Sequence, residues 1–113
     1  MSETALVDAC LRYLRLCKVL AWRQNSGVMA VHARGRRSRY VRFGGIVGAS
    51  DLMGILPQHD DGAGKVHLPG RFLAVECKRR PNRVTWAQGQ FIEAVRAHGG
   101  LALVIYDAQE LVD

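Results

Sequence analysis

The sequence lacks any long apolar run. Its longest, residues 101–106, falls well short of the ~18 residues that a membrane-spanning helix requires. Met1 to Thr4 carry no basic cluster, and Asp8 and Arg12 interrupt the apolar centre that a secretory signal would need. We therefore expect no membrane partner and a cytoplasmic location.

Cysteine is scarce and odd in number. The three cysteines form no Cys-x-x-Cys pair, and the four histidines are scattered without the spacing of a zinc finger. An odd number of cysteines without a secretory signal argues against a disulfide framework. We expect reduced thiols and no structural zinc site.

Acidic residues are also few. The chain has 16 basic and 10 acidic residues, which gives a net charge of +6 and a pI near 9.8. Arginine outnumbers lysine 13 to 3, and guanidinium groups bind phosphate oxygens in pairs. This balance favours a nucleic-acid partner, but composition alone does not separate a binding protein from an enzyme.

The 113 residues, 49% apolar and 23% charged, suit one compact domain spanning residues 1–113. Hydrophobic periodicity predicts an α/β domain, a mixed central β-sheet flanked by helices in the order α-β-β-β-β-α-β. The expected helices are residues 4–19, capped by Ser2, and 85–98, with a helical turn within 107–113. The expected strands are residues 28–32, 39–43, 51–56, 71–78 and 101–106, the last buried on both faces, with a polar loop at 58–70.

The same periodicity predicts which helical side chains face the core. In the first helix Cys10 and Cys17 are expected to be small core residues. In the second helix the expected inward positions are Phe91, Ile92, Val95 and Ala97.

Two carboxylates and a lysine are the expected catalytic residues. Side chains alternate along a strand, so Glu76 and Lys78 are predicted to share one face. Asp51 stands at the start of a neighbouring strand, directly after a glycine-containing turn. Two carboxylates can hold a divalent cation that polarises a phosphate, and an ammonium can stabilise the transition state. The alternative is a surface ion pair between Glu76 and Lys78 on an edge strand.

Six short motifs in order carry a resemblance over nearly the whole chain. They are Glu3 in the first helix, Arg23-Gln24-Asn25-Ser26-Gly27, Gly48-Ala49-Ser50-Asp51, Glu76-Cys77-Lys78, Thr85-Trp86-Ala87-Gln88 and Gly99-Gly100. With them the chain resembles the VRR-Nuc (virus-type replication-repair nuclease) branch of the PD-(D/E)XK nuclease superfamily. It departs from the superfamily pattern at Ser50, where a proline is usual.

The resemblance implies a restriction-endonuclease-like core and a metal-dependent DNA endonuclease. It further implies a homodimer that acts on branched DNA, Holliday junctions or flaps, in phage or bacterial replication, recombination or repair. Asp51, Glu76 and the main-chain carbonyl of Cys77 would bind Mg²⁺ or Mn²⁺, with a contribution from Glu3. Lys78 would assist the attacking water, and Gln88 would support the site from its helix.

The expected nucleic-acid contacts are mostly arginines, because phosphate contacts supply most nonspecific affinity. They are Arg23, Asn25, Arg34, Arg36, Arg37, Arg39, Arg42, Arg79, Arg80 and Arg83. Trp86 is expected either to stack on an unpaired base or to pack in the core.

Further alternatives stay open from the sequence. Thr85 and Gln88 also form a capping box, so the glutamine can serve the helix, the site or both. The whole chain can instead be a non-catalytic nucleic-acid-binding module, or a basic adaptor that recruits a protein.

Overall fold

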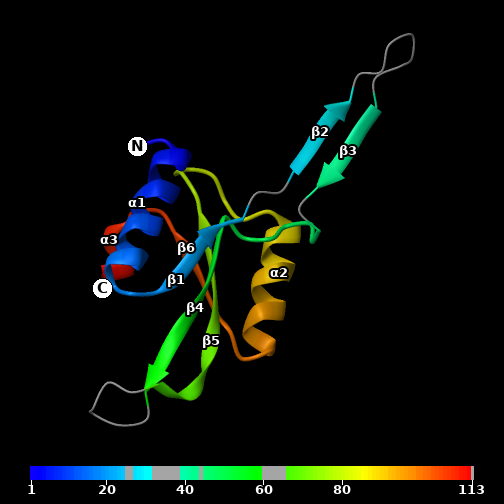
Figure 1. Ribbon diagram of the computed structural model, residues 1–113. Coiled ribbons are helices and arrows are strands. Elements are labelled where there is room, and N and C mark those ends of the chain that lie inside the picture. The colour runs from blue at the N-terminus through cyan, green and yellow to red at the C-terminus, as the bar shows by residue number, and fades with distance from the viewer. Residues whose placement is uncertain (25–26, 32–38, 44, 60–65, 113) are drawn as a thin grey trace.

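A computed structural model of the chain describes residues 1–24, 27–31, 39–43, 45–59 and 66–112. Three helices and six strands follow one another in this part of the chain (Figure 1). The helices are α1 (Glu3–Leu16), α2 (Trp86–Ala97) and α3 (Gln109–Val112). The strands are β1 (Leu20–Arg23), β2 (Gly27–Val31), β3 (Arg39–Phe43), β4 (Leu52–His59), β5 (Val66–Cys77) and β6 (Leu101–Ile105).

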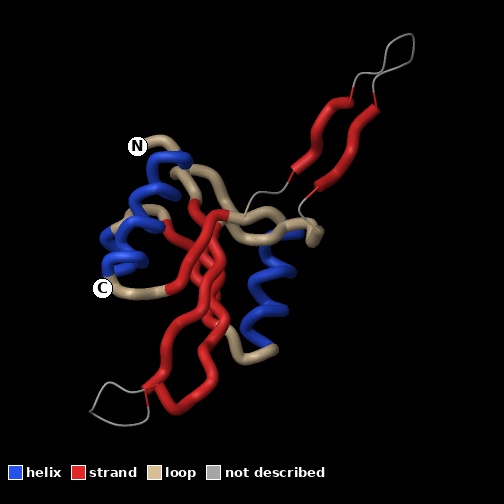
Figure 2. The backbone as a smooth tube through the Cα atoms, viewed as in Figure 1, coloured by secondary structure: helices blue, strands red, loops and turns tan. Residues whose placement is uncertain are grey.

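The main sheet has four strands in the order β1-β4-β5-β6. Its first three strands pair antiparallel, whereas β5 and β6 are parallel, with α2 in the connection between them. The sheet is therefore mixed, and α1 and α2 cover its opposite faces (Figures 1 and 2). This confirms the α/β fold with a mixed central sheet flanked by helices.

The strands β2 and β3 form a separate antiparallel hairpin, in which Gly27 pairs with Phe43 and Val31 with Arg39. The hairpin predicted at residues 28–32 and 39–43 is confirmed with its first strand shifted by one residue. Figure 1 shows it beyond the end of the main sheet at which α2 begins. The hairpin is inserted in the chain between β1 and β4, which pair with each other.

Two hydrophobic layers hold the domain together, and β5 contributes to both. Leu73, Val75 and Cys77 pack with α1 and with Ile105 of β6, whereas Ala74 packs on the other face with Phe91 and Ile92 of α2. Because side chains alternate along a strand, one central strand anchors both helices. The residues just after this doubly buried segment are consequently fixed in place.

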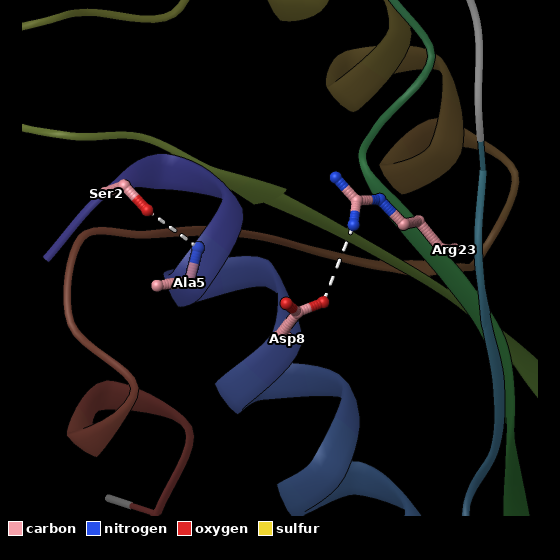
Figure 3. Close-up of polar contacts among 4 residues, drawn as sticks. All are labelled: Ser2, Ala5, Asp8 and Arg23. Atoms are coloured by element: carbon pink, nitrogen blue, oxygen red, sulfur yellow. Dashed lines mark hydrogen bonds and ion pairs between the residues drawn. The ribbon is translucent and has the colours of Figure 1, made fainter.

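The start of α1 agrees with the sequence and its end does not. The Ser2 hydroxyl accepts a hydrogen bond from the Ala5 amide at 3.1 Å, the expected cap (Figure 3). The helix ends at Leu16, and Cys17 is exposed rather than in the core. Lys18 has a φ of 64°, which ends the helix before residue 19.

The strand β1 forms at residues to which the sequence analysis assigned no element, directly after the end of the expected helix. The predicted order α-β-β-β-β-α-β therefore omitted one strand, while the helical turn near the carboxyl end is confirmed as α3. The predicted loop at 58–70 is also too long, because β4 reaches His59 and β5 begins at Val66. Backbone pairing extends both strands past the point where side-chain periodicity ends.

The expected second helix and the expected last strand are both present, with differences in which side chains are buried. Helix α2 buries Phe91 and Ile92 and packs Val95 against the core, but Ala97 is exposed, so that inward position was wrong. Strand β6 packs on both faces as expected, with Ile105 in the α1 layer and Ala102 in the α2 layer, although its other three residues are only partly buried. Within the described residues, no helix is long and apolar enough to cross a membrane.

A close backbone approach joins the segment before β4 to the start of α2. Gly48 has a φ of 83°, and a Cβ on it would press against the Ala87 carbonyl and lie 2.7 Å from the Gln88 nitrogen. Glycine is required there both by its backbone angle and by the missing space. Gly45 has a similar φ of 77° but open space around it.

We expect Gly48→Ala to destabilise the protein more than Gly45→Ala. The control incurs the left-handed backbone cost of ~1–2 kcal/mol, whereas the Gly48 variant must also displace the start of α2, for a total of about 3 kcal/mol or more. Urea unfolding followed by circular dichroism measures both. Equal losses would show that the contact with α2 contributes nothing.

Candidate active site

The predicted site residues meet at one end of the main sheet. Asp51 directly precedes β4, and Leu52 pairs with Val75, the residue before Glu76. The antiparallel register therefore brings the first carboxylate to the end of β5, beside the second. The start of α2, which carries Gln88, lies at this same end (Figure 1).

Asp51 is held by two hydrogen bonds to its neighbours. Its Oδ2 accepts from the Cys77 amide at 2.8 Å. Its main-chain carbonyl accepts from the Gln24 amide at 2.8 Å, just beyond β1. The carboxylate is thus fixed between the two neighbouring strands.

Glu76 is almost fully buried, with 1% of its surface exposed. Its Oε1 accepts a hydrogen bond from Gln88 Nε2 at 2.8 Å. Its Oε2 is buried and has no hydrogen-bond partner. Within the described part of the chain, the other such buried side-chain atom is Ser50 Oγ, directly before Asp51. Both orphaned oxygens therefore belong to this site, and each lacks a partner that folding normally supplies.

The surroundings of Glu76 favour its protonated form. Burial, reinforced by the negative charge of Asp51, raises the pKa of Glu76 to about 8. Lys78 opposes this rise. Once protonated, Glu76 also hydrogen-bonds to Asp51, which adds to the rise, and Glu3 adds to it through its own negative charge. The first turn of α1 therefore lies near enough to act on the site electrostatically. A cation between the two carboxylates would reverse the balance.

Gln88 performs both roles that the sequence left open. Its Oε1 accepts from the Thr85 amide at 2.9 Å, and the Thr85 hydroxyl accepts from the Gln88 amide at 3.1 Å, which completes a capping box. The other end of the same side-chain amide donates to Glu76. The start of α2 is thereby tied to the end of β5 through one side chain.

Lys78 is the first residue beyond β5, and its amide donates to the Ile105 carbonyl at 2.9 Å. Only 8% of its surface is exposed. Since β5 lies between β4 and β6 and Glu76 is also buried, the alternative of a surface ion pair on an edge strand is wrong. Lys78 is therefore buried together with Glu76 and acts on it electrostatically.

The residues present fit a divalent cation. Asp51 and Glu76 supply carboxylate oxygens, the donors that Mg²⁺ and Mn²⁺ prefer, and Glu76 Oε2 is without a partner. Among the described residues no three His, Cys, Asp or Glu side chains cluster as a metal site. Any further ligands would be main-chain carbonyls or water, as is usual for magnesium.

The Cys77 side chain takes no part in the site. It points into the core on the α1 side, where it packs with Cys10. A hydrogen bond with Cys10, together with burial, keeps the pKa of the Cys77 thiol well above its ordinary value. Only the main chain of Cys77 therefore faces the chemistry.

Three expected nucleic-acid contacts lie just after the Glu-x-Lys segment and are exposed: Arg79, Arg80 and Arg83. The Arg80 guanidinium stacks over the Tyr106 ring, 4.5 Å from its centroid, which restrains it. With Lys78, Arg79 and Arg80 line a cavity of about 440 Å³. Asp107 and Glu110 also line this cavity, whereas Asp51 and Glu76 do not, so the basic loop is joined to the two carboxylates through Lys78.

The remaining expected contacts are less informative. Arg23 pairs with Asp8 at 3.5 Å, and both side chains are substantially exposed (Figure 3). Arg39 and Arg42 lie on β3, but the described structure does not extend to their side chains. Asn25, Arg34, Arg36 and Arg37 lie outside the described residues.

Trp86 is 80% exposed at the first position of α2, so the alternative of core packing is wrong. Sequence reasoning missed Ser50 as a site residue, because it considered only the missing proline there. The available signal was a small hydroxyl residue between a glycine turn and an acid. Sequence reasoning also missed the Arg80–Tyr106 stack, which no local spacing indicates.

Comparisons of the chain with protein-family models, with curated proteins and with solved structures found no match. The residues of this site are therefore the basis for inferring a function.

We expect the metal-free protein to lose stability as the pH rises from 4.5 to about 8. In this window the folded state retains the Glu76 proton that the unfolded chain releases, so the free energy of unfolding falls by up to ~1.4 kcal/mol per pH unit. Below the window both states bind the proton, and above it neither does. Glu76→Gln should lack this slope.

The measurement is urea unfolding in EDTA across the pH range, with the Gln variant as the reference for all other titrating groups. Millimolar Mg²⁺ should flatten the wild-type slope by favouring the carboxylate. A wild-type slope equal to that of Glu76→Gln would contradict the buried, protonated glutamate.

Proposed function

We propose that the protein is a metal-dependent deoxyribonuclease that hydrolyses phosphodiester bonds within DNA. The supporting observation is the pair of adjoining carboxylates, of which Glu76 is buried with an unpartnered oxygen, beside a buried lysine. Burying such a group is unfavourable unless a partner compensates for it. A divalent cation would compensate for this burial, and a metal-dependent nuclease requires such a cation for its chemistry.

Each group of the chain has a defined task in this proposal. Bound between Asp51 and Glu76, the ion would polarise the phosphate and acidify a water molecule. Lys78 stabilises the charge that develops on the phosphate or orients the water. Gln88 holds Glu76, and the Cys77 amide holds Asp51, so that both carboxylates keep their positions. Arg79, Arg80 and Arg83 bind the flanking phosphates.

The fold and the charge support the finer parts of the proposal. The mixed sheet with helices on both faces is what a restriction-endonuclease-like core of the VRR-Nuc branch requires. A net charge of +6 suits a polyanionic substrate. Preference for Holliday junctions or flaps, a homodimer, and a place in phage or bacterial replication, recombination or repair belong to the same proposal. A homodimer would present two symmetric sites to a junction.

We expect cleavage of DNA in Mg²⁺ or Mn²⁺ and none in EDTA. Labelled four-way junction, flap, single-stranded and linear duplex DNA rank the substrates. Lys78→Met keeps the buried stem and Asp51→Asn keeps an acceptor for the Cys77 amide, so both variants should fold. Each should lose about 100-fold or more of the cleavage rate while retaining DNA binding in a gel shift.

The rival function is a non-catalytic DNA-binding module. It is favoured by the structural bonds that Asp51 and Gln88 make to the main chain, which need no chemistry to explain them. Intact DNA under all metal conditions, with a salt-sensitive gel shift, would establish the module and refute the nuclease. Absence of both cleavage and salt-sensitive binding would favour the protein adaptor.

Variants of the two capping-box residues should distinguish an effect on stability from an effect on cleavage. Thr85→Ala and Gln88→Ala each remove one of the two reciprocal cap bonds, so each should cost ~1 kcal/mol of stability. Gln88→Ala also frees the Glu76 carboxylate and should lower the cleavage rate by about 10- to 100-fold. Thr85→Ala should cleave nearly as the wild type does. Equal rates for the two variants would leave Gln88 a purely structural residue.

A further inference from the structure

An exposed apolar cluster adjoins the candidate active site. It consists of Trp86, Ile46 and Val47, whose side chains are 80%, 63% and 53% exposed. Ile46 and Val47 come directly before Gly48, and Trp86 directly before Ala87. Because the Gly48 backbone lies against Ala87 and Gln88, all three apolar side chains belong to two segments that touch.

The geometry of these segments is fixed. The Ala49 amide donates to the Ile46 carbonyl at 3.3 Å, which closes a turn, and Trp86 opens a helix that the capping box holds. The turn leads directly into Ser50 and Asp51, and the helix leads to Gln88. The turn and the helix that carry the cluster therefore also position Asp51 and Gln88.

The charge around the cluster favours one kind of binding partner over another. The loop before Trp86 carries the exposed arginines Arg79, Arg80 and Arg83. A second copy of the chain docking here by two-fold symmetry would bring basic loops near each other, which is unfavourable. A nucleic-acid strand offers negative phosphates to the arginines and an apolar face of a base to the tryptophan.

On the basis of the proposed nuclease function, we propose that Trp86, with Ile46 and Val47, is a stacking platform for an unpaired base next to the scissile phosphate. Bases within a duplex are stacked on their neighbours and cannot use the platform. The protein thus favours DNA with single-stranded segments, such as flaps and open junctions, over continuous duplex.

Binding is measured in EDTA, so that it does not depend on cleavage. Trp86→Ala should weaken binding to a single-stranded oligonucleotide or a flap by about tenfold and change the affinity for linear duplex by less than about twofold. Trp86→Phe should restore most of the loss. Leu16→Ala is the matched control, since Leu16 is 76% exposed and lies at the other end of α1, about 20 Å along the helix from Glu3.

Tryptophan fluorescence gives a direct readout of stacking. In a Trp22→Phe background, Trp86 is the remaining tryptophan, and a stacked base should quench its emission. An oligonucleotide of abasic residues carries the same phosphates without bases and should leave the emission unchanged. Quenching by the first strand alone supports the platform, and equal quenching by both, or none at saturation, overturns it.

The remaining outcomes separate this proposal from the nuclease. Base-dependent quenching in a protein that cleaves no DNA would support the platform and refute the nuclease. Metal-dependent cleavage without quenching would support the nuclease and refute the platform. A Trp86 emission that shifts with protein concentration in the absence of DNA, together with a doubled mass in light scattering, would assign the cluster to self-association and overturn the platform.

Discussion

The buried carboxylate of Glu76 is the constraint around which this end of the molecule is arranged. It lies at the end of β5, the strand that anchors both helices, so it cannot turn outward without disturbing the core. Three separate segments therefore bring groups to it: Gln88 from α2, Asp51 from the start of β4 and Lys78 from the residue after β5. A structural role alone does not account for this arrangement, since replacing a buried ion pair by well-packed apolar side chains is commonly neutral or stabilising.

The sequence was sufficient for features that depend on local periodicity. The apolar run before Glu76 predicted the strand at residues 71–78, and Thr85-x-x-Gln88 predicted the capping box; both are present, the strand as part of β5. The neighbourhood of Asp51 and Glu76 needed one more step, the assumption that their strands are adjacent. The register of Leu52 with Val75 meets that assumption.

The sequence was insufficient wherever backbone pairing or a distant partner decides the outcome. The strand β1 has only one buried residue, Ala21, and forms because its main chain pairs with β4. The helix before it stops at a left-handed Lys18, for which the residue type gives no signal. Likewise, the capping motif shows that Gln88 reaches back to Thr85, but only the packing of α2 on the sheet shows that the other end of its amide reaches Glu76.

The contact of Gly48 with the start of α2 gives the site a property that none of its residues has alone. The turn before β4 carries the exposed Ile46 and Val47 and then Asp51, while the first turn of α2 carries Trp86 and then Gln88. Because these two segments touch through their backbones, the exposed apolar side chains depend on the same contact as Asp51 and Gln88. The lack of space beside Gly48 fixes the distance between the two segments, since protein interiors are close-packed.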